Sequence, residues 1–89
     1  LTILDVYRFI SNYVFKHNGI ASYLGGDNLL AILPEEEYKL FLEIIPTYIK
    51  AGVGISHNSR KALELAARAL SMIRSGRVRE NIIVLHDSS

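Results

Sequence analysis

The sequence contains no cysteine and no tryptophan, and its single methionine does not stand at position 1. Without cysteine the chain forms no disulfide, no thiolate metal site and no cysteine nucleophile. Redox chemistry by the chain's own residues is therefore excluded. Any chemistry must come from carboxylates, amides, imidazoles or basic groups.

A strong charge of one sign and long apolar runs are also missing. The lysines and arginines number 10 and the aspartates and glutamates 9, for a net charge of +1, which is too mild to indicate nucleic-acid binding. No apolar run approaches the roughly 20 residues that span a bilayer. The composition predicts a soluble, cytoplasmic protein that has neither a nucleic acid nor a membrane as its partner.

The length of 89 residues allows one small domain. A folded chain of this size buries only roughly 60 to 65% of the surface that its unfolded form exposes, so its stability alone is marginal. The sequence begins at Leu1, without an initiator Met and without the charged and then apolar order of a signal peptide. We therefore expect one domain over residues 1–89, cut from a longer polypeptide, with the missing amino-terminal half and further copies of the chain as partners.

The spacing of apolar residues predicts helices and strands in the order α-β-β-α-β-α-β. Apolar positions three and four residues apart are typical of amphipathic helices, and short apolar runs between turn residues are typical of strands. In chain order we expect a helix over 3–14, strands over 20–24 and 29–33, a helix from 34 to 46, a strand over 50–56, a helix from 58 or 59 to about 74, and a strand over 82–85.

Three local patterns refine this order. Pro34 followed by the acidic run 35–37 predicts a helix start, because proline suits the first turn and carboxylates favour the positive end of the helix dipole. Gly52 and Gly54 fall on one face of their strand and predict a flat strip that another group approaches closely. The run 29–33 does not alternate with polar residues, which predicts a strand buried on both faces.

Helices covering a mixed sheet with a hairpin in it predict an α+β sandwich of the ferredoxin-like type. In such a fold a strand in the centre of the sheet feeds the first helix, and nothing before Leu1 supplies it. Without that strand the hairpin would have an exposed edge, which natural domains avoid. We therefore expect the first strand to be missing, either cut away or supplied by another chain.

The most informative stretch is the turn Gly25-Gly26-Asp27-Asn28. Two glycines let a phosphate approach the main chain without a Cβ in the way, and Asp27 can hold Mg²⁺, which prefers one or two carboxylates together with phosphate oxygens. Asn28 offers a donor and an acceptor that can read a purine edge, although an amide is a poor Mg²⁺ ligand beside a carboxylate. The same residues suit any tight hairpin turn, so a purely conformational role stays open.

Basic residues and histidines supply the other candidates. Arg60 and Lys61 fall at a predicted helix N-terminus, where free N–H groups favour anions, and we expect them to bind substrate phosphate. The alternative is that both are solvated surface charges. His17, His57 and His86 are dispersed and show no spacing of a metal triad, which favours structural roles.

Three separated blocks resemble the palm-type domains of nucleotide cyclases: the hairpin at 25–28, the strand 51–56 and the helix 58–74. In diguanylate cyclases of that group the hairpin reads GGDEF. A closer resemblance, over nearly all of the chain, is to archaeal GTP cyclohydrolase III, whose later hairpin reads GGDN and whose next segment has the form K-x-GIG-x-x-x-NAR. This sequence reads KAGVGISHNSR there, with Val53 in place of an isoleucine and Ser59 in place of an alanine.

That resemblance implies a palm fold and a Mg²⁺-dependent hydrolase that opens the imidazole ring of GTP. The product would be a formylaminopyrimidine ribonucleotide 5′-monophosphate, with release of phosphate. It implies Asp27 as the catalytic and metal-binding acid, Gly25 and Gly26 against the nucleotide, and Asn28 where GGDEF has its glutamate. One carboxylate is not a two-metal site, so the other acid is expected on the missing strand and the chain alone is expected to be inactive.

Two alternatives stay open. A degenerate cyclase-like palm would bind GTP or a cyclic dinucleotide and regulate an attached module, since Asn28 removes a metal ligand that a working diguanylate cyclase needs. A ligand-free ferredoxin-like interaction domain would lose only stability on Asp27→Ala.

Overall fold

The structure, a computed structural model, describes residues 2–87, so Leu1, Ser88 and Ser89 of the predicted domain lie outside the described residues. Within them the α+β class is confirmed, with three helices and a mixed sheet of four strands. No helix among them is long and apolar enough to cross a membrane. The elements are α1 (Ile3–Lys16), β1 (Ile20–Tyr23), β2 (Asn28–Ile32), α2 (Tyr38–Ile44), β3 (Lys50–Ile55), α3 (Ser59–Arg74) and β4 (Ile82–His86).

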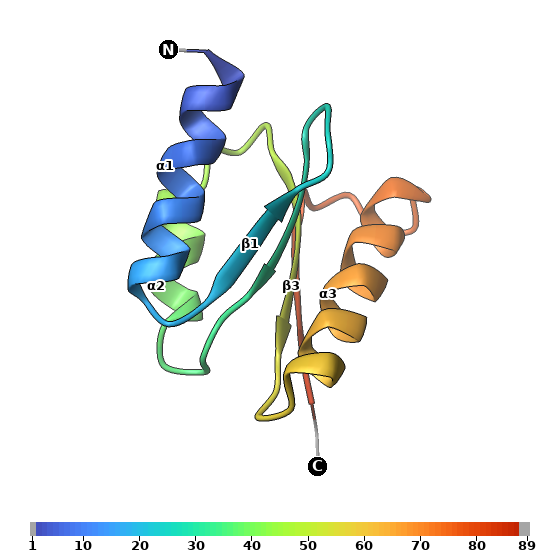
Figure 1. Ribbon diagram of the computed structural model, residues 1–89. Coiled ribbons are helices and arrows are strands. Elements are labelled where there is room, and N and C mark those ends of the chain that lie inside the picture. The colour runs from blue at the N-terminus through green and yellow to red at the C-terminus, as the bar shows by residue number, and fades with distance from the viewer. Residues whose placement is uncertain (1, 88–89) are drawn as a thin grey trace.

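The strands lie side by side in the order β1-β2-β3-β4. The hairpin strands β1 and β2 are antiparallel, whereas β2, β3 and β4 are all parallel. Helices α1 and α2 cover one face of the sheet and α3 covers the other (Figure 1). The identification of this arrangement as a ferredoxin-like or palm fold stays a prediction.

In the described sheet, β2 has a paired strand on each side. Residues Asn28–Ile32 of β2 pair directly with 50–54 of β3, because the chain returns through α2 and lays β3 parallel to β2. The hairpin still has an edge without a strand partner among the described residues, because β1 forms the edge of the sheet. The predicted first strand itself falls before the described residues and stays a prediction.

Helix α1 begins with a capping box that the sequence analysis missed. The Thr2 hydroxyl accepts the N–H of Asp5 at 3.2 Å, and the Asp5 carboxylate accepts the N–H of Thr2 at 3.1 Å. A Thr followed three residues later by an acidic residue is the signal that would have revealed it. The helix buries Tyr7, Ile10 and Val14 against the sheet.

Helix α2 begins at Tyr38, so the prediction that Pro34 and the acidic run 35–37 open it is wrong. Pro34 instead starts a turn in which its carbonyl accepts the N–H of Glu37 at 3.0 Å. Glu37 stands at the N-cap position without a capping hydrogen bond from its side chain.

The physical reason is that two of these carboxylates have partners elsewhere. Glu35 Oε2 lies 2.9 Å from His86 Nδ1 at the end of β4, and Glu37 Oε2 lies 2.9 Å from His17 Nδ1 at the end of α1. These contacts hold the turn to two other elements. They support the structural roles predicted for His17 and His86.

Helix α3 follows its prediction closely. The Asn58 side chain caps it by accepting the N–H of Lys61 at 3.1 Å. Gly52 and Gly54 of β3 face the helix, and a Cβ at either position would collide with the α3 backbone at Ala66 or Ala62. The group predicted to approach the glycine strip is therefore α3 itself.

Strand β2 is not buried on both faces as predicted. Leu29 and Ala31 are buried beneath α1 and α2, whereas Leu30 and Ile32 on the α3 side are only partly buried. The reason is that α3 lies mainly over β3 and covers β2 incompletely.

We expect Gly54→Ala to lower the free energy of unfolding by at least about 3 kcal/mol, because the methyl group forces the α3 backbone away from the sheet. Urea unfolding followed by circular dichroism measures the change. Ser71→Ala, on the exposed side of α3, is the control and should stay within about 0.5 kcal/mol of the parent. Equal stabilities of the two variants would contradict the close packing.

Candidate functional site

The Gly25–Asn28 turn has the backbone that its glycines predict. Gly25 and Gly26 adopt φ of 94° and 58°, in the region that favours glycine. The turn is closed by the N–H of Leu24, bonded to the Asn28 carbonyl, and by the N–H of Asn28, bonded to the Gly25 carbonyl, both at 3.1 Å. No other group lies within 4 Å of the place where a Gly25 Cβ would stand. The conformational role is real, and the tip also leaves room for a ligand against its main chain.

Asp27 presents its carboxylate beside this open space. Its side chain is 46% exposed, and Oδ2 lies 3.9 Å from the Lys50 ammonium. The Lys50 N–H donates to the Asp27 carbonyl at 2.7 Å, which fixes the tip to the start of β3. An ion pair this exposed and this long contributes little stability, so the carboxylate can exchange it for another cation at small cost.

Two tyrosines, Tyr23 and Tyr7, lie next to the tip. The Tyr23 hydroxyl donates to the Gly26 carbonyl at 2.9 Å, and the Tyr23 ring lies 3.9 Å, between centroids, from the ring of Tyr7 in α1. Tyr7 is 3% exposed. Burial, with smaller contributions from Tyr23, Asp27 and Tyr48, raises the pKa of Tyr7 to about 12. In the sequence, a tyrosine three residues before Gly26 is the signal for this contact.

Asn28 holds an acceptor without a partner. Its Nδ2 donates to the Gly25 carbonyl over a long 3.3 Å, whereas its Oδ1 is buried and accepts no hydrogen bond from the described residues. The Tyr7 hydroxyl is likewise buried without a partner among them. Buried polar groups are nearly always paired in native proteins, so two unpaired groups near one turn mark the tip as a place where a ligand or ordered water belongs.

The donors at the tip fit part of a Mg²⁺ site. Mg²⁺ is commonly bound through one or two carboxylates, with water and phosphate oxygens completing its shell, and Asp27 provides one exposed carboxylate. Among the described residues, no three or more side chains of His, Cys, Asp or Glu gather as a metal site. Within the described residues, Asp27 is thus the carboxylate that the tip offers to a metal.

Arg60 and Lys61 do not lie at this tip. Lys50 of β3 is next to the turn, but α3 begins only after β3 has run its length to Ile55, roughly 16 Å away at about 3.3 Å per residue. Figure 1 shows the turn between β1 and β2 and the start of α3 at opposite ends of the sheet. The structure thus does not bring the predicted basic pair together with Asp27.

The basic residue that returns to the hairpin end is Arg74, in the last turn of α3. Arg74 lines a shallow hollow together with Leu24, the residue that precedes the turn. A helix of 16 residues is about 24 Å long, long enough to span a strand and come back to its beginning. The length of the helix that the sequence predicts therefore indicates that its C-terminal end returns to the hairpin.

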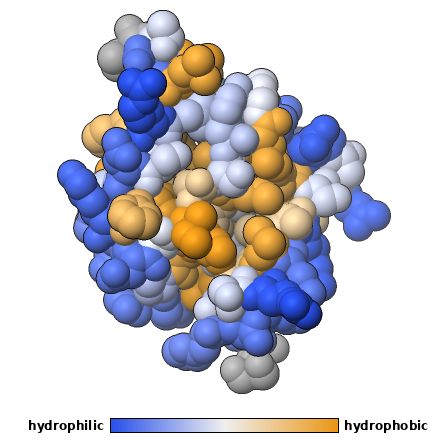
Figure 2. Space-filling model, in the orientation of Figure 1, coloured by the Kyte–Doolittle hydropathy of each residue, from blue (hydrophilic) through white to orange (hydrophobic). Residues whose placement is uncertain are grey.

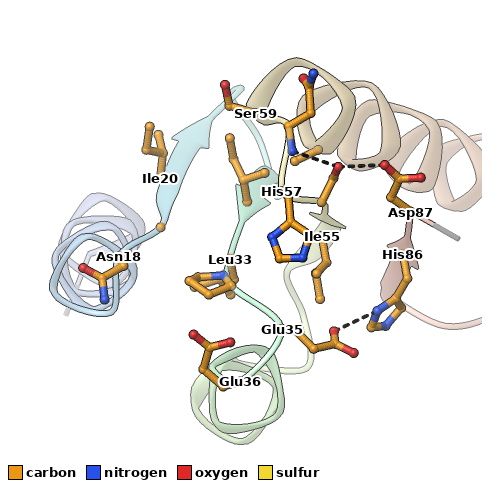
Figure 3. A pocket seen from close by; sticks show the side chains of 16 residues that line it. Asn18, Ile20, Leu33, Glu35, Glu36, Ile55, His57, Ser59, His86 and Asp87 are labelled. Atoms are coloured by element: carbon orange, nitrogen blue, oxygen red, sulfur yellow. Dashed lines mark hydrogen bonds and ion pairs between the residues drawn. The ribbon is translucent and has the colours of Figure 1, made fainter. Parts of the chain in front are cut away.

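The larger hollow, of about 740 Å³, lies at the other end of the sheet, where β2, β3 and β4 end and α3 begins (Figure 3). Its polar groups bind one another: the Ser56 hydroxyl donates to Asp87 at 2.8 Å and accepts the N–H of Asn58 at 3.1 Å. His57 lines it, and His86 is paired with Glu35. It contains none of the turn residues 25–28, although Ile20 and Ile32 of the hairpin strands line it.

Comparison with known proteins identifies relatives. A family model described as GTP cyclohydrolase III matches residues 1–87. The GTP cyclohydrolase III of Saccharolobus solfataricus (strain ATCC 35092 / DSM 1617 / JCM 11322 / P2) is 37% identical over 79 residues, which cover 86% of this chain and 34% of the relative. That of Sulfurisphaera tokodaii is 36% identical over 86 residues, covering 94% and 38%. The chain thus spans about a third of the length of these relatives. No solved structure matches it.

We expect removal of the hydroxyl group to change the free energy of unfolding differently at Tyr23 and at Tyr7. Tyr23→Phe loses the hydrogen bond to Gly26 and should lower the free energy of unfolding by about 1 kcal/mol. Tyr7→Phe removes an unpaired buried hydroxyl and should leave stability unchanged or raise it. Urea unfolding at pH 7 gives both values, and the reverse order would contradict these contacts.

The raised pKa of Tyr7 predicts a loss of stability in alkali. In the folded chain Tyr7 keeps its proton to about pH 12, whereas the unfolded chain releases it near pH 10. This contribution to stability is therefore complete below pH 10 and falls as the pH rises towards 12. Tyr7→Phe should remove that fall from urea unfolding measured between pH 9 and 11.5. Tyr38→Phe, at a tyrosine that is not among the groups that raise the Tyr7 pKa, is the control and should keep it.

Proposed function

The chain belongs to the GTP cyclohydrolase III family, and we propose that it forms part of an enzyme that hydrolyses GTP in the presence of Mg²⁺. The reaction opens the imidazole ring of guanine and leaves a formylaminopyrimidine ribonucleotide 5′-monophosphate with release of phosphate. One observation carries the assignment of the site: at Gly25 and Gly26 the main chain is open to a ligand, directly beside the half-exposed carboxylate of Asp27.

In this proposal the hairpin binds the phosphate side of GTP. Gly25 and Gly26 allow a phosphate to approach the main chain, and Asp27 holds Mg²⁺. A metal held by Asp27 would supply positive charge against the phosphate of the substrate. Lys50, whose ammonium lies 3.9 Å from Asp27, would turn to a phosphate oxygen when the metal takes the carboxylate. The unpaired Oδ1 of Asn28 would accept an N–H from the ligand or from a bound water.

The site proposed here is incomplete within this chain. It has one carboxylate, and no metal-binding cluster occurs among residues 2–87. Since the relatives are nearly three times as long as the segment they share with this chain, we place the remaining metal ligands and the group that activates the attacking water in the part of the polypeptide that the chain does not span. The comparisons do not favour a degenerate cyclase-like palm or a ligand-free interaction domain.

We expect the 89-residue chain to bind GTP with Mg²⁺ at the hairpin and to release no product. Chromatography with mass detection should find GTP unchanged. In amide NMR spectra, GTP with Mg²⁺ should shift the signals of residues 25–28. Asp27→Asn should abolish the part of this shift that depends on Mg²⁺, and Arg60→Gln, at the far end of the sheet, should keep it.

Either of two results would contradict this assignment. Clear turnover by the purified chain would show that its site is complete. Shifts confined to the hollow around His57 and His86 would move the nucleotide to the opposite end of the sheet.

In the complete polypeptide, we expect Asp27→Ala to lower Mg²⁺-dependent turnover of GTP by roughly two to three orders of magnitude, because the metal loses its anchoring carboxylate. Circular dichroism should show an intact fold. The product of the unmodified enzyme is identified by its mass. Activity that survives the substitution would show that Asp27 does not hold the metal.

A further inference from the structure

The hydroxyl group of Tyr7 is buried and has no hydrogen-bond partner among the described residues, in a side chain that is 3% exposed. Figure 2 shows apolar side chains gathered in the middle of the face over β1 and mainly hydrophilic ones around them. The hairpin turn, at the top of the same view in Figure 1, belongs to this hydrophilic rim. Polar groups on the rim are hydrated, whereas the Tyr7 hydroxyl is shielded from bulk water.

Packing alone does not account for this hydroxyl. A phenylalanine at position 7 would fill nearly the same space without burying an unpaired donor, which lowers the stability of the folded chain. Unpaired buried groups in native proteins are concentrated where function needs them. The Tyr7 hydroxyl therefore points to an acceptor that it reaches in the liganded state of the site.

Tyr7 lies at the hairpin end of the molecule, close to Asp27. Its ring lies 3.9 Å, between centroids, from the ring of Tyr23, whose own hydroxyl donates to the Gly26 carbonyl. Helical side chains lean towards the helix N-terminus, and Figure 1 shows the start of α1 at the same end as the hairpin turn. Burial raises the pKa of Tyr7 to about 12, with Tyr23 and then Asp27 adding to the effect. The Asp27 carboxylate is thus within electrostatic reach of the hydroxyl.

The Asp27 carboxylate would need a new donor once it binds a cation. Its Oδ2 lies 3.9 Å from the Lys50 ammonium, which in the proposed function turns to a phosphate oxygen. Carboxylates that bind metals are in turn held by hydrogen bonds from neighbouring groups. The Tyr23 hydroxyl is already bonded to Gly26, whereas Tyr7 is a described donor beside the tip that has no other acceptor.

We propose that Tyr7 is a positioning residue of the metal site: when Asp27 holds the cation through one carboxylate oxygen, the Tyr7 hydroxyl donates to the other. The hydrogen bond fixes the orientation of the carboxylate. Its acceptor is charged and its donor is buried, and both conditions strengthen it. Tyr7 touches neither nucleotide nor metal. This role rests on the proposed function and deepens it, because Tyr7 acts only through Asp27.

The same helix provides a matched control. The Tyr13 hydroxyl is also buried without a partner among the described residues. Its ring stacks on His17 at the end of α1, about 9 Å further along the helix axis than Tyr7. Tyr13→Phe thus removes the same kind of group at a distance from the hairpin turn.

The test compares GTP binding with Mg²⁺ and with EDTA, followed by the amide NMR signals of residues 25–28 of the 89-residue chain. We expect Mg²⁺ to tighten binding to the parent, and Tyr7→Phe to lose most of that gain, since such partners change metal affinity by roughly 10- to 100-fold. Tyr13→Phe should keep the gain. Tyr7→Phe should also unfold in urea no more easily than the parent, which separates positioning from a structural role.

A second measurement uses the parent chain with ¹³C-labelled tyrosine rings. The Tyr7 signal, identified by its absence from Tyr7→Phe, should shift when Mg²⁺ and GTP are added, and should stay in place in Asp27→Asn.

The outcomes separate this role from the proposed function. Equal gains for Tyr7→Phe and Tyr13→Phe, with the gain lost in Asp27→Asn, would overturn the role of Tyr7 and leave the metal at Asp27. A Tyr7→Phe chain that loses the gain because it unfolds more easily would also overturn it. A parent chain without any Mg²⁺-dependent gain would contradict the proposed function and the role of Tyr7 together.

Discussion

The contact between α3 and the glycines of β3 determines the arrangement of everything else. Because a side chain at Gly52 or Gly54 would collide with the helix backbone, α3 lies directly on β3 and contacts β2 and β4 less extensively. In this position the start of α3, with Arg60, lies at the end of the sheet away from the hairpin turn. Arg74, in the last turn of α3, lies at the hairpin end. It also leaves β1 without a cover on that face. The separation of Arg60 from the candidate site thus follows from this one contact.

The two ends of the sheet differ in how their polar groups are satisfied. Where the parallel strands end, the side chains form pairs. Ser56 donates to Asp87, and His86 pairs with Glu35. At the hairpin, the Asn28 Oδ1 and the Tyr7 hydroxyl are buried without partners among the described residues. The tilted ring pair of Tyr7 and Tyr23 and the hydrogen bond from Tyr23 to Gly26 lie beside the tip, whose main chain is open to a ligand. The Tyr13 hydroxyl, in α1 beside His17, is also buried without a partner among them, so the open main chain of Gly25 and Gly26 beside Asp27 is what favours the hairpin as the nucleotide site.

Local features were predictable from the sequence. The glycine turn, the Asn58 cap and the approach to Gly52 and Gly54 each depend on residues close in the chain or on one strand face. Failures came from contacts between distant residues. The acidic run at 35–37 has the composition of a helix start, yet Glu35 pairs with His86 and Glu37 with His17, and no local pattern reveals such partners. Arg60 looked like a phosphate ligand, but its distance from the hairpin depends on topology, which residue types alone do not reveal.

In the proposed function, a nucleotide and its metal bind this chain at the Gly25–Asn28 turn. The most direct test adds Mn²⁺ with GTP, in place of Mg²⁺, to the isotope-labelled chain, because the paramagnetic ion broadens NMR signals close to it. We expect the amides of residues 25–28 and of Lys50, which binds the Asp27 carbonyl, to lose far more intensity than those of residues 57–61. Broadening centred on residues 57–61, with the hairpin unaffected, would contradict it.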